Sequence, residues 1–531
     1  MSLQRLDWRF LLPPPEAGVY ERMVVPGAPR DLIQIVRETG IARHVQSHPS
    51  ADHSADLVAV LAGAELSPRA AACSLAPGGV LYYEVDRRRP SYHATTPTRI
   101  AREVHDAGLT LTGCYWARPN FARCVFYIPL DRSGALSWYV GTLFRRTTRP
   151  RRLLAPALLA LVGTVGRSIG SLAPCFAVTA EAPGGERQVP WTGYGALPPG
   201  LRQSDLRPLV MMTGGDEHSR VILLPFAPGR NRPEAVLKAS RAPDFNRYTE
   251  REQVLLCDIR ARLDDELRPT MPEPLGLRRE GRPVVSAESY SPGQRLAALF
   301  APGRAVPEKL HDLDRAASWL AAFHRQARVS QGAWDAEAIA RWCRTPIDSY
   351  RRRFGLNPDE GRLFAAVQDR AHALIGLPFP VVWQHHDFNE LNVLRSERRL
   401  HVIDWERARP GPALSDLLYF GLRWSFLARG LHTEAQHLRG FKELFVQSHY
   451  DDRVVVAVRQ AFERYRTAQG LDERFVPLLV VTTWVDHALD HFERLRALGR
   501  LTANVREGNG YTRFVEVLAA HVDVLFAASR A

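Results

Sequence analysis

The residues best suited to chemistry lie close together in the C-terminal half of the chain. Residues 385–392 read HHDFNELN, an H-x-D-x-x-x-x-N pattern, and they follow a β-rich run at 381–383. A second β-rich run, 400–403, ends in Asp404. A chain of this length contains the eight-residue pattern by chance on the order of a few times in a hundred. The spacing therefore indicates one site that collects side chains from two strand ends.

These residue types suit the transfer of a phosphoryl group to a hydroxyl. A carboxylate at Asp387 could orient the attacking hydroxyl and accept its proton. Asn392 would bring a neutral oxygen ligand to Mg²⁺ from the same loop, and Asp404 would bring an anionic one from the next strand. Such a metal neutralises the charge that develops on the transferred phosphate. A single carboxylate could not place both the nucleophile and the metal.

A lysine upstream could hold phosphates. Lys238 closes the third of three predicted strands, Gly214-Gly215 lies in the first turn, and the helix that follows carries Glu250 and Glu252. An extended lysine held by a helix glutamate binds the α- and β-phosphates of ATP in protein-kinase-like folds. A solvated strand end is the alternative interpretation of Lys238. The predicted strands span 208–213, 220–226 and 235–239, and the helix spans 248–263.

Together, these motifs make residues 205–531 resemble the aminoglycoside phosphotransferase and choline kinase branch of the protein-kinase-like superfamily. The signature of that branch is H-G-D-x-x-x-x-N followed by I-D-W or I-D-F, and His386 stands here in place of the glycine. The resemblance implies that ATP and magnesium are the cofactors. It assigns the role of catalytic base to Asp387, of magnesium ligands to Asn392 and Asp404, of phosphate-binding lysine to Lys238 and of its partner to Glu252.

The same resemblance extends to less specific positions. Gly214 and Gly215 lie where the family has its phosphate-binding loop. Glu288 begins the segment ESYSPG, which resembles the connection between the two lobes, whose backbone meets adenine. Asp416 also matches the pattern, which implies that it braces the catalytic loop or caps a helix. Residues 315–324, RAASWLAAFH, match a helix of the family that we expect to serve packing.

The histidines allow rival interpretations. Residues 385–387, HHD, could ligate a metal. The segment HALDH at 487–491 has two histidines at i, i+4 spacing, but the zinc-protease helix requires H-E-x-x-H. Asp486 and Asp490 could instead bind hydroxyls or an amine of an acceptor, as late acidic helices do in this branch. We favour a solvated helix face.

The first region, residues 1–185, predicts an open, largely parallel α/β sheet, because β-rich runs alternate with helical patterns. Residues 56–87, DLVAVLAGAELSPRAAACSLAPGGVLYYEVDR, resemble the second half of a class I S-adenosylmethionine-dependent methyltransferase. The glycine-rich turn of such enzymes is replaced by PGAP at 26–29, and the candidate second strand, 42–47, ends without a carboxylate. We therefore expect a degenerate, non-catalytic domain. The β-rich runs span 21–26, 56–61, 80–85 and 124–130.

The resulting fold class is an α/β N-terminal domain with a Rossmann-like open sheet, joined to an α+β, protein-kinase-like domain of two lobes. A stretch rich in glycine and proline marks the boundary between them. We expect a methyltransferase-like domain at 1–185, a linker at 186–205, an N-lobe at 206–290 and a helical C-lobe with the catalytic loop at 291–531.

The amino-acid composition limits the classes of protein and of partner that fit this sequence. The 531 residues are 45% hydrophobic and 24% charged, as expected of a folded protein with two or three domains. The net charge of +13 would suit an anionic partner. However, only three of the 70 basic residues are lysines, and no basic cluster carries interleaved aromatics, so we expect no nucleic-acid binding. Six scattered cysteines without a C-x-x-C pair and a polar N-terminus predict a cytoplasmic protein.

One apolar stretch, residues 153–165, has arginines on both sides. Its length falls short of the ~20 residues that span a bilayer. We expect a buried helix there. The alternative is a weak contact of residues 145–167 with an anionic membrane surface.

Three functions fit this sequence. The first is an ATP- and magnesium-dependent phosphotransferase that acts on a hydroxyl of a small molecule, such as a sugar, an aminoglycoside or an amino alcohol. The second is a non-catalytic scaffold with kinase-like and methyltransferase-like halves, and the third is a bifunctional kinase and methyltransferase. All expected catalytic positions are filled, which favours the first. The sequence leaves the acceptor and the oligomeric state open.

We predict that residues 1–185 do not bind S-adenosylmethionine. The methionine end of that cofactor normally meets backbone N–H groups of a glycine-rich turn, and its ribose meets a carboxylate that ends the next strand. Residues 26–29 offer a single glycine between prolines, and the carboxylate is missing. Equilibrium dialysis with labelled S-adenosylmethionine should show no binding. Binding at micromolar concentrations would favour the bifunctional enzyme.

Overall fold

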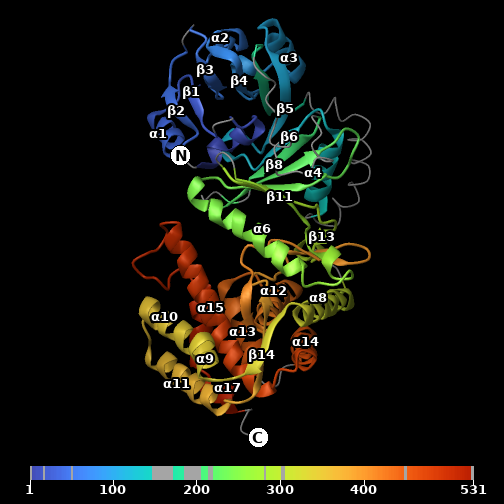
Figure 1. The fold of residues 1–531 in the computed structure, drawn as a ribbon, viewed down its shortest axis with the longest axis vertical. Helices are drawn as coiled ribbons and strands as arrows, with labels where there is room; N and C mark the ends of the chain where they lie inside the picture. The colour runs from blue at the N-terminus through green and yellow to red at the C-terminus, as the bar shows by residue number, and fades with distance from the viewer. Residues whose placement is uncertain are drawn as a thin grey trace. The chain divides into compact units, whose positions relative to one another are not determined.

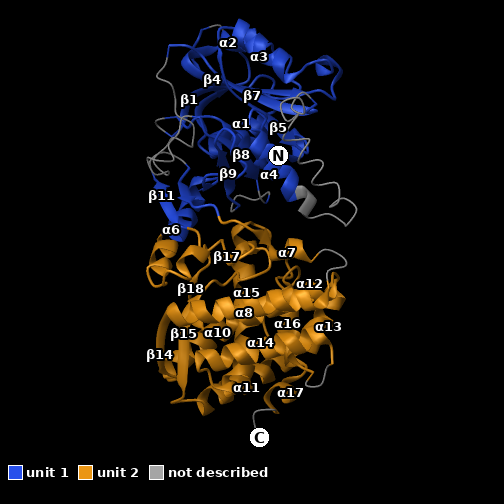
Figure 2. Cartoon of the chain, turned by 90° about the vertical axis from the view of Figure 1, so that its right-hand side faces the viewer, with its two compact units in different colours: residues 1–253, 273–290 blue, residues 254–272, 291–531 orange. Residues whose placement is uncertain are grey.

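The structure is a computed structural model. Its residues form two compact units, which Figure 2 draws in different colours. Unit 1 comprises residues 1–253 and 273–290, and unit 2 comprises residues 254–272 and 291–531. The domain boundaries expected from the sequence stay a prediction. The structure describes residues 3–15, 18–49, 52–145, 172–184, 205–212, 214, 219–279, 283–300, 305–447 and 451–527.

Unit 1 is built on one sheet of twelve strands (Figure 1). The strands are β1 Tyr20–Val24, β2 Ala42–Gln46, β3 Ala55–Val60, β4 Leu75–Asp86, β5 Thr110–Arg118, β6 Phe126–Pro129, β7 Cys175–Glu181, β8 Arg207–Met212, β9 Val221–Phe226, β10 Val236–Ala239, β11 Pro274–Arg278 and β12 Val285–Glu288. Their order is β11-β12-β10-β9-β8-β6-β5-β7-β4-β3-β1-β2. The N-terminal region and the strands around Lys238 therefore share one hydrogen-bonded sheet.

The N-terminal part of this sheet is mixed. β2, β1, β3 and β4 are parallel neighbours, as the alternation of strands and helices predicts. β7 lies between β4 and β5 and runs antiparallel to both, and β6 pairs antiparallel with β5. The prediction of a largely parallel sheet is thus correct for β1 to β4 and wrong for β5 to β7. Sequence reasoning identified neither β5 nor β7, and both of these strands pair antiparallel with their neighbours. The Rossmann-like character stays a prediction.

Residues 76–79, Ala-Pro-Gly-Gly, precede the β-rich run predicted at 80–85, but they lie inside β4. Ala55 pairs with Leu75 and Leu57 pairs with Val80, so the four residues between them bulge opposite a single residue of β3. Such a bulge bends a strand without ending it. The pattern Ala-Pro-Gly-Gly indicated an irregularity correctly but placed a strand boundary where none exists.

The strands around Lys238 lie close to their predicted positions. β8, β9 and β10 form an antiparallel series, and β10 continues into β12 and β11. The predicted helix is α6, Asn246–Arg260. At the junction with the N-terminal strands, Phe126 of β6 pairs with Met211 of β8, and Tyr127 pairs with Val210.

Helices and a 3₁₀ segment cover both faces of the sheet. The 3₁₀ segment η1, Leu3–Leu11, and helix α1, Arg30–Glu38, pack on one face, where a single apolar core extends from β1 to β12. Helices α2, Pro68–Ala72, and α3, Pro97–Asp106, cover the other face of the N-terminal strands. Helix α4, Ser133–Arg145, packs on β6, β8 and β9.

Unit 2 is mainly helical and has one large apolar core. Two small sheets, β13-β16-β17 and β14-β15-β18, carry the candidate catalytic residues at their strand ends. The strands are β13 Gln294–Arg295, β14 Arg328–Ala333, β15 Pro378–Gln384, β16 Val393–Arg395, β17 Leu400–Val402 and β18 Arg409–Pro412. The longer helices are α8 Val306–Gln326, α10 Thr345–Phe354, α11 Pro358–Ala373, α12 Ser415–Arg429, α13 Glu434–Phe445, α14 Arg453–Gln469, α15 Val476–Ala497 and α16 Gly510–Ala519.

Within the described ranges, no helix combines the length and the apolar character needed to cross a membrane. The apolar stretch at 153–165 and most of the basic segment around it lie outside these ranges. The predicted buried helix and the alternative membrane contact both fall there.

The packing of α4 predicts a strong effect of one small substitution. A Cβ at Gly134 would overlap the backbone carbonyl oxygen of Arg230, in the loop after β9. We expect Gly134→Ala to lower the free energy of unfolding by about 1–3 kcal/mol, because backbone cannot move aside as a side chain can. Urea unfolding measures the change.

The same helix offers the control. Among the residues that the structure describes, and apart from its chain neighbours and the backbone of its own helix, nothing would lie within 4 Å of a Cβ at Gly141. Gly141→Ala should be neutral or stabilise by up to ~1 kcal/mol, since alanine favours the helix. Equal effects of the two substitutions would contradict the close contact between α4 and this loop.

Candidate functional site

Asp387, the predicted base, lies in the loop after β15. The Nδ2 of Asn389 donates to one of its carboxylate oxygens at 2.8 Å, and the Nδ2 of Asn392 donates to the other at 3.0 Å. Burial raises the pKa of the carboxyl, and the guanidinium of Arg407 opposes that rise. Two amides of its own loop therefore fix the orientation of the carboxylate.

His386 adopts a left-handed backbone conformation, with φ at +61°. Glycine enters this region without steric cost, which explains why the related signature has glycine there. Histidine is among the residues that enter it more readily than most others. The replacement of glycine by His386 is therefore compatible with the turn that presents Asp387.

Asp416, at the start of α12, braces this turn. Its two carboxylate oxygens accept hydrogen bonds from the backbone N–H groups of His385 and His386, at 2.7 and 2.8 Å. Burial would raise the pKa of Asp416, but His324 of α8, whose Nε2 lies 3.4 Å from it, helps to hold that pKa below its ordinary value. Of the two roles expected for Asp416, the structure shows the bracing of the loop.

His385 connects the loop to the next strand. Its Nδ1 accepts the backbone N–H of Asp387 at 3.2 Å, and its Nε2 lies 3.0 Å from the carbonyl oxygen of Ile403. A backbone N–H can only donate, so the ring proton resides on Nε2 and is donated to Ile403. The position of Asp387 is thereby tied to the strand end that precedes Asp404. This ring has no ligand position left for a metal.

Asn392 and Asp404 lie at neighbouring strand ends. Asn392 directly precedes β16, and Asp404 is the second residue after β17. The N–H of Ile403, between β17 and Asp404, donates to the backbone carbonyl of Asn392 at 3.0 Å. The Nδ2 of Asn392 is used by Asp387, which leaves its side-chain carbonyl as the atom able to bind a cation. An amide carbonyl and a carboxylate suit the oxygen preference of Mg²⁺. The residues present fit this metal.

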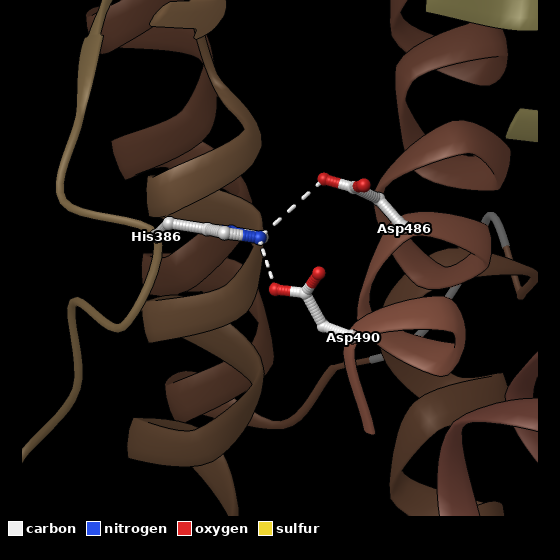
Figure 3. A group of neighbouring side chains, drawn as sticks. All are labelled: His386, Asp486 and Asp490. Atoms are coloured by element: carbon white, nitrogen blue, oxygen red, sulfur yellow. Dashed lines mark ion pairs between the residues drawn. The ribbon is translucent and has the colours of Figure 1, made fainter. Parts of the chain in front are cut away.

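A second cluster, drawn in Figure 3, joins the catalytic turn to α15. The Nε2 of His386 lies 2.7 Å from Asp490 and 3.6 Å from Asp486. Arg409 of β18 donates to Asp486 at 2.6 Å and also contacts His386. Burial opposes ionisation of Asp490, but His386 and Arg409 hold its pKa well below the ordinary value.

The three potential ligand atoms of this cluster lie within 4.8 Å of one another, a spacing that could hold a metal ion. However, Arg409 already pairs with both carboxylates, at 2.6 Å from Asp486 and 3.4 Å from Asp490. Sequence reasoning treated the HHD segment and the acidic helix as separate groups. The i, i+4 spacing predicts that Asp486 and Asp490 share a helix face, but no sequence signal places His386 beside them.

The two histidines of α15 do not form a common site. His487 is buried, its ring stacks on Tyr419 at 4.2 Å between centroids, and burial lowers its pKa. His491 lies 3.2 Å from the carbonyl oxygen of Gly508. The metal interpretation based on their spacing finds no support in these contacts.

Lys238 of unit 1 lies between two carboxylates. Its Nζ donates to Glu252 of α6 at 2.6 Å, as the resemblance implies, and lies 3.0 Å from Glu288 of β12. Arg220 binds Glu252 as well. Sequence reasoning missed Arg220 and expected only the backbone around Glu288 to matter. Gly214, with φ at +69°, lies in the loop after β8, and Gly215 lies outside the described residues.

The two carboxylates have opposite pKa shifts. Burial alone would raise both pKa values, but Arg220 and Lys238 lower the pKa of Glu252 to about 2. Burial raises the pKa of Glu288 to about 7, the charge of Glu252 adds to this rise, and Lys238 and Arg220 oppose it. Lys238 therefore pairs more strongly with Glu252 than with Glu288.

The comparisons with known proteins identify a family for part of the chain. Residues 226–445 match the model of the APH family, described as the phosphotransferase enzyme family. This segment contains Lys238, Glu252, Asp387, Asn392 and Asp404, and over it the resemblance seen in the sequence is confirmed. The match does not include residues 1–185, whose likeness to a methyltransferase stays a prediction. The search among curated proteins returned no match.

Several solved structures are similar at low identity. A candidate aminoglycoside phosphotransferase from Ralstonia eutropha JMP134 is 14% identical, with a TM-score of 0.38, over 59% of this chain and 92% of the other. A glucosamine kinase is 16% identical, with a TM-score of 0.33, over 59% and 88%. A macrolide 2′-phosphotransferase from Brachybacterium faecium is 17% identical, with a TM-score of 0.31, over 56% and 91%. The family match, and not these likenesses, carries the assignment of residues 226–445.

The raised pKa of Glu288 predicts a pH-dependent stability. The folded state binds this proton more tightly than the unfolded chain, whose glutamate has a pKa near the ordinary 4.5. The stabilising contribution of protonated Glu288 is therefore present below about pH 4.5 and is lost as pH rises through about 7. Glu288→Gln cannot ionise, so at pH 8 it should be more stable than wild type by on the order of 1 kcal/mol, and at pH 5 the difference should be smaller.

Urea unfolding from pH 5 to 8 measures this difference. Glu273→Gln, which removes an exposed carboxylate near the same strand, is the control and should leave the pH profile unchanged. A constant difference between Glu288→Gln and wild type across this range would show that Glu288 does not titrate there.

Proposed function

We propose that the protein is an ATP- and magnesium-dependent phosphotransferase that acts on a hydroxyl of a small molecule. The observation that carries this proposal is the carboxylate of Asp387, which two amides of its own loop hold in one orientation beside the strand end of Asp404. The family match of residues 226–445 supports it.

Each residue has a defined task in the proposed reaction. Asp387 orients the acceptor hydroxyl and accepts its proton as the oxygen bonds to the γ-phosphorus of ATP, and ADP leaves with the electrons of the broken P–O bond. Lys238 binds the α- and β-phosphates, and Glu252 keeps its side chain extended. Magnesium held by Asn392 and Asp404 would neutralise charge on the phosphates.

The cluster of His386, Arg409, Asp486 and Asp490 is suited to the acceptor. It follows directly from the turn that presents Asp387, and both carboxylates remain partly exposed. An amine would have to compete with Arg409 for them, whereas hydroxyl groups can donate to the carboxylates without displacing a cation. Sugars and amino alcohols with several hydroxyls therefore suit it.

A non-catalytic scaffold is the second candidate. The observation that favours it is the engagement of Lys238 by two carboxylates, since phosphates would have to compete with Glu288 for the ammonium. The near-neutral pKa of Glu288 reduces this competition, because the group is largely uncharged below about pH 7. We favour the enzyme for this reason.

Two measurements test the proposal. Calorimetry should show binding of Mg-ATP, and a screen for ATP consumption should identify an acceptor among sugars, aminoglycosides and amino alcohols. Binding without turnover over a broad panel would favour the scaffold. A wild-type protein that shows neither heat nor a thermal shift with Mg-ATP would remove the basis of the kinase proposal.

The proposed roles predict different defects for two aspartates. Asp387→Asn should keep Mg-ATP affinity but lose turnover by ~10²-fold or more, because the amide cannot accept the proton. Asp404→Ala should also lose the magnesium dependence of ATP binding. Steady-state kinetics and calorimetry at varied magnesium separate the two. Asp369→Asn, which changes an exposed residue of α11, controls for the loss of one negative charge. Full activity of Asp387→Asn would exclude Asp387 as the base.

A further inference from the structure

The N-terminal segment η1 is buried against the sheet of unit 1, although it lies more than 200 residues before Lys238 in the chain. Leu6, Trp8 and Phe10 are almost completely buried in the core that extends from β1 to β12. Trp8 also stacks on Tyr82 of β4, with 4.4 Å between ring centroids. Segment η1 is therefore an integral part of this unit.

One charged pair links η1 to the strand of Lys238. The Nε of Arg241, two residues after β10, donates to the carboxylate of Asp7 at 2.9 Å, and both side chains are fully buried. Arg9 donates to the backbone carbonyl of Arg241 at 2.5 Å. A buried ion pair of this kind is costly to break from one side, because the remaining charge is left in an apolar environment.

Arg241 also reaches the loop after β8. Its Nη1 donates to the carbonyl oxygen of Gly214 at 3.0 Å. Gly214 has φ at +69° and lies where the family places its phosphate-binding loop. A guanidinium offers donors in two directions at once, so one side chain can join Asp7 to this loop.

We propose that Asp7 and Arg241 are positioning residues for nucleotide binding, and that η1 thereby becomes a functional part of the phosphate-binding lobe. Asp7 fixes the guanidinium of Arg241, and Arg241 holds the backbone of Gly214 at the start of the loop. This inference rests on the proposed function, because it requires that the loop meets ATP. It assigns a role in nucleotide binding to a segment far outside the family match at 226–445.

The test variant is Arg241→Lys in the full-length chain. Lysine keeps the positive charge beside Asp7, but a single ammonium on a flexible chain cannot bridge two partners with the same geometry. We expect the Kd of Mg-ATP, measured by calorimetry, to rise roughly tenfold, the size expected from loss of one hydrogen bond made by a charged group. Acceptor KM should change little. Hydrogen exchange of the backbone at 205–226 should become faster.

Arg5→Lys is the matched control on the same segment. Arg5 forms a bidentate pair with Glu84 of β4, with distances of 2.6 and 2.5 Å, and it has no bond to Arg241 or Gly214. This substitution loosens η1 by a similar chemical change at a different contact. It should leave the Kd of Mg-ATP and the hydrogen exchange at 205–226 unchanged.

The outcomes are distinguishable. A wild-type chain that binds no Mg-ATP would overturn the proposed function and this inference with it. If the wild type binds and Arg241→Lys binds equally well, only the positioning role is overturned. Equal losses in Arg241→Lys and Arg5→Lys would mean that general loosening of η1 is responsible, which also overturns it. If Arg241→Lys does not fold, Asp7→Asn serves as the second variant. It keeps an oxygen acceptor for Arg241 but removes the negative charge that fixes the guanidinium, so it must raise the Kd of Mg-ATP for the proposal to stand.

Discussion

The candidate catalytic loop depends on one buried carboxylate. The turn at His385 and His386 leaves regular strand geometry, so its backbone N–H groups have no neighbouring strand to bind, and buried N–H groups without partners are costly. Asp416 accepts both of them. Each such bond to a charged acceptor contributes about 1.5–3 kcal/mol, which is enough to offset a left-handed residue that is not glycine. The orientation of Asp387 follows from this turn.

The region around Lys238 depends on a different balance of charge. One ammonium serves two buried carboxylates, and a second cation, Arg220, joins the side of Glu252. The negative charge therefore concentrates on Glu252, while Glu288 keeps its proton until near-neutral pH. Phosphate groups brought close to Lys238 would raise the pKa of Glu288 further, because like charges disfavour ionisation. Protonation of Glu288 and phosphate binding would thus favour each other.

Features that depend on residues close together in the chain could be predicted from the sequence. The strand before Asp387 and the helix of Glu252 follow from short motifs and periodicity, and the pairing of Glu252 with Lys238 follows from the resemblance to the family. The second partner of Lys238, the approach of His386 to the acidic helix and the insertion of β7 between β4 and β5 depend on pairings between distant segments. Single-sequence periodicity carries no information on such pairings, since the same apolar run fits either direction of a strand. The position of each helix or strand was therefore easier to predict than the order and direction of the strands in the sheet.

The shared sheet changes what the N-terminal region contributes. Without β6, the strand β8 would present an unpaired edge, and such edges favour non-specific association. Without η1, Arg241 would lose Asp7 and leave a charge in the apolar core. The first contact acts on β8, which precedes the loop of Gly214, and the second acts on Arg241, which donates a hydrogen bond to Gly214 itself. Residues 1–185 therefore stabilise the strands that carry Lys238 through hydrogen bonds and an ion pair, and this contribution does not require that the region bind a cofactor of its own.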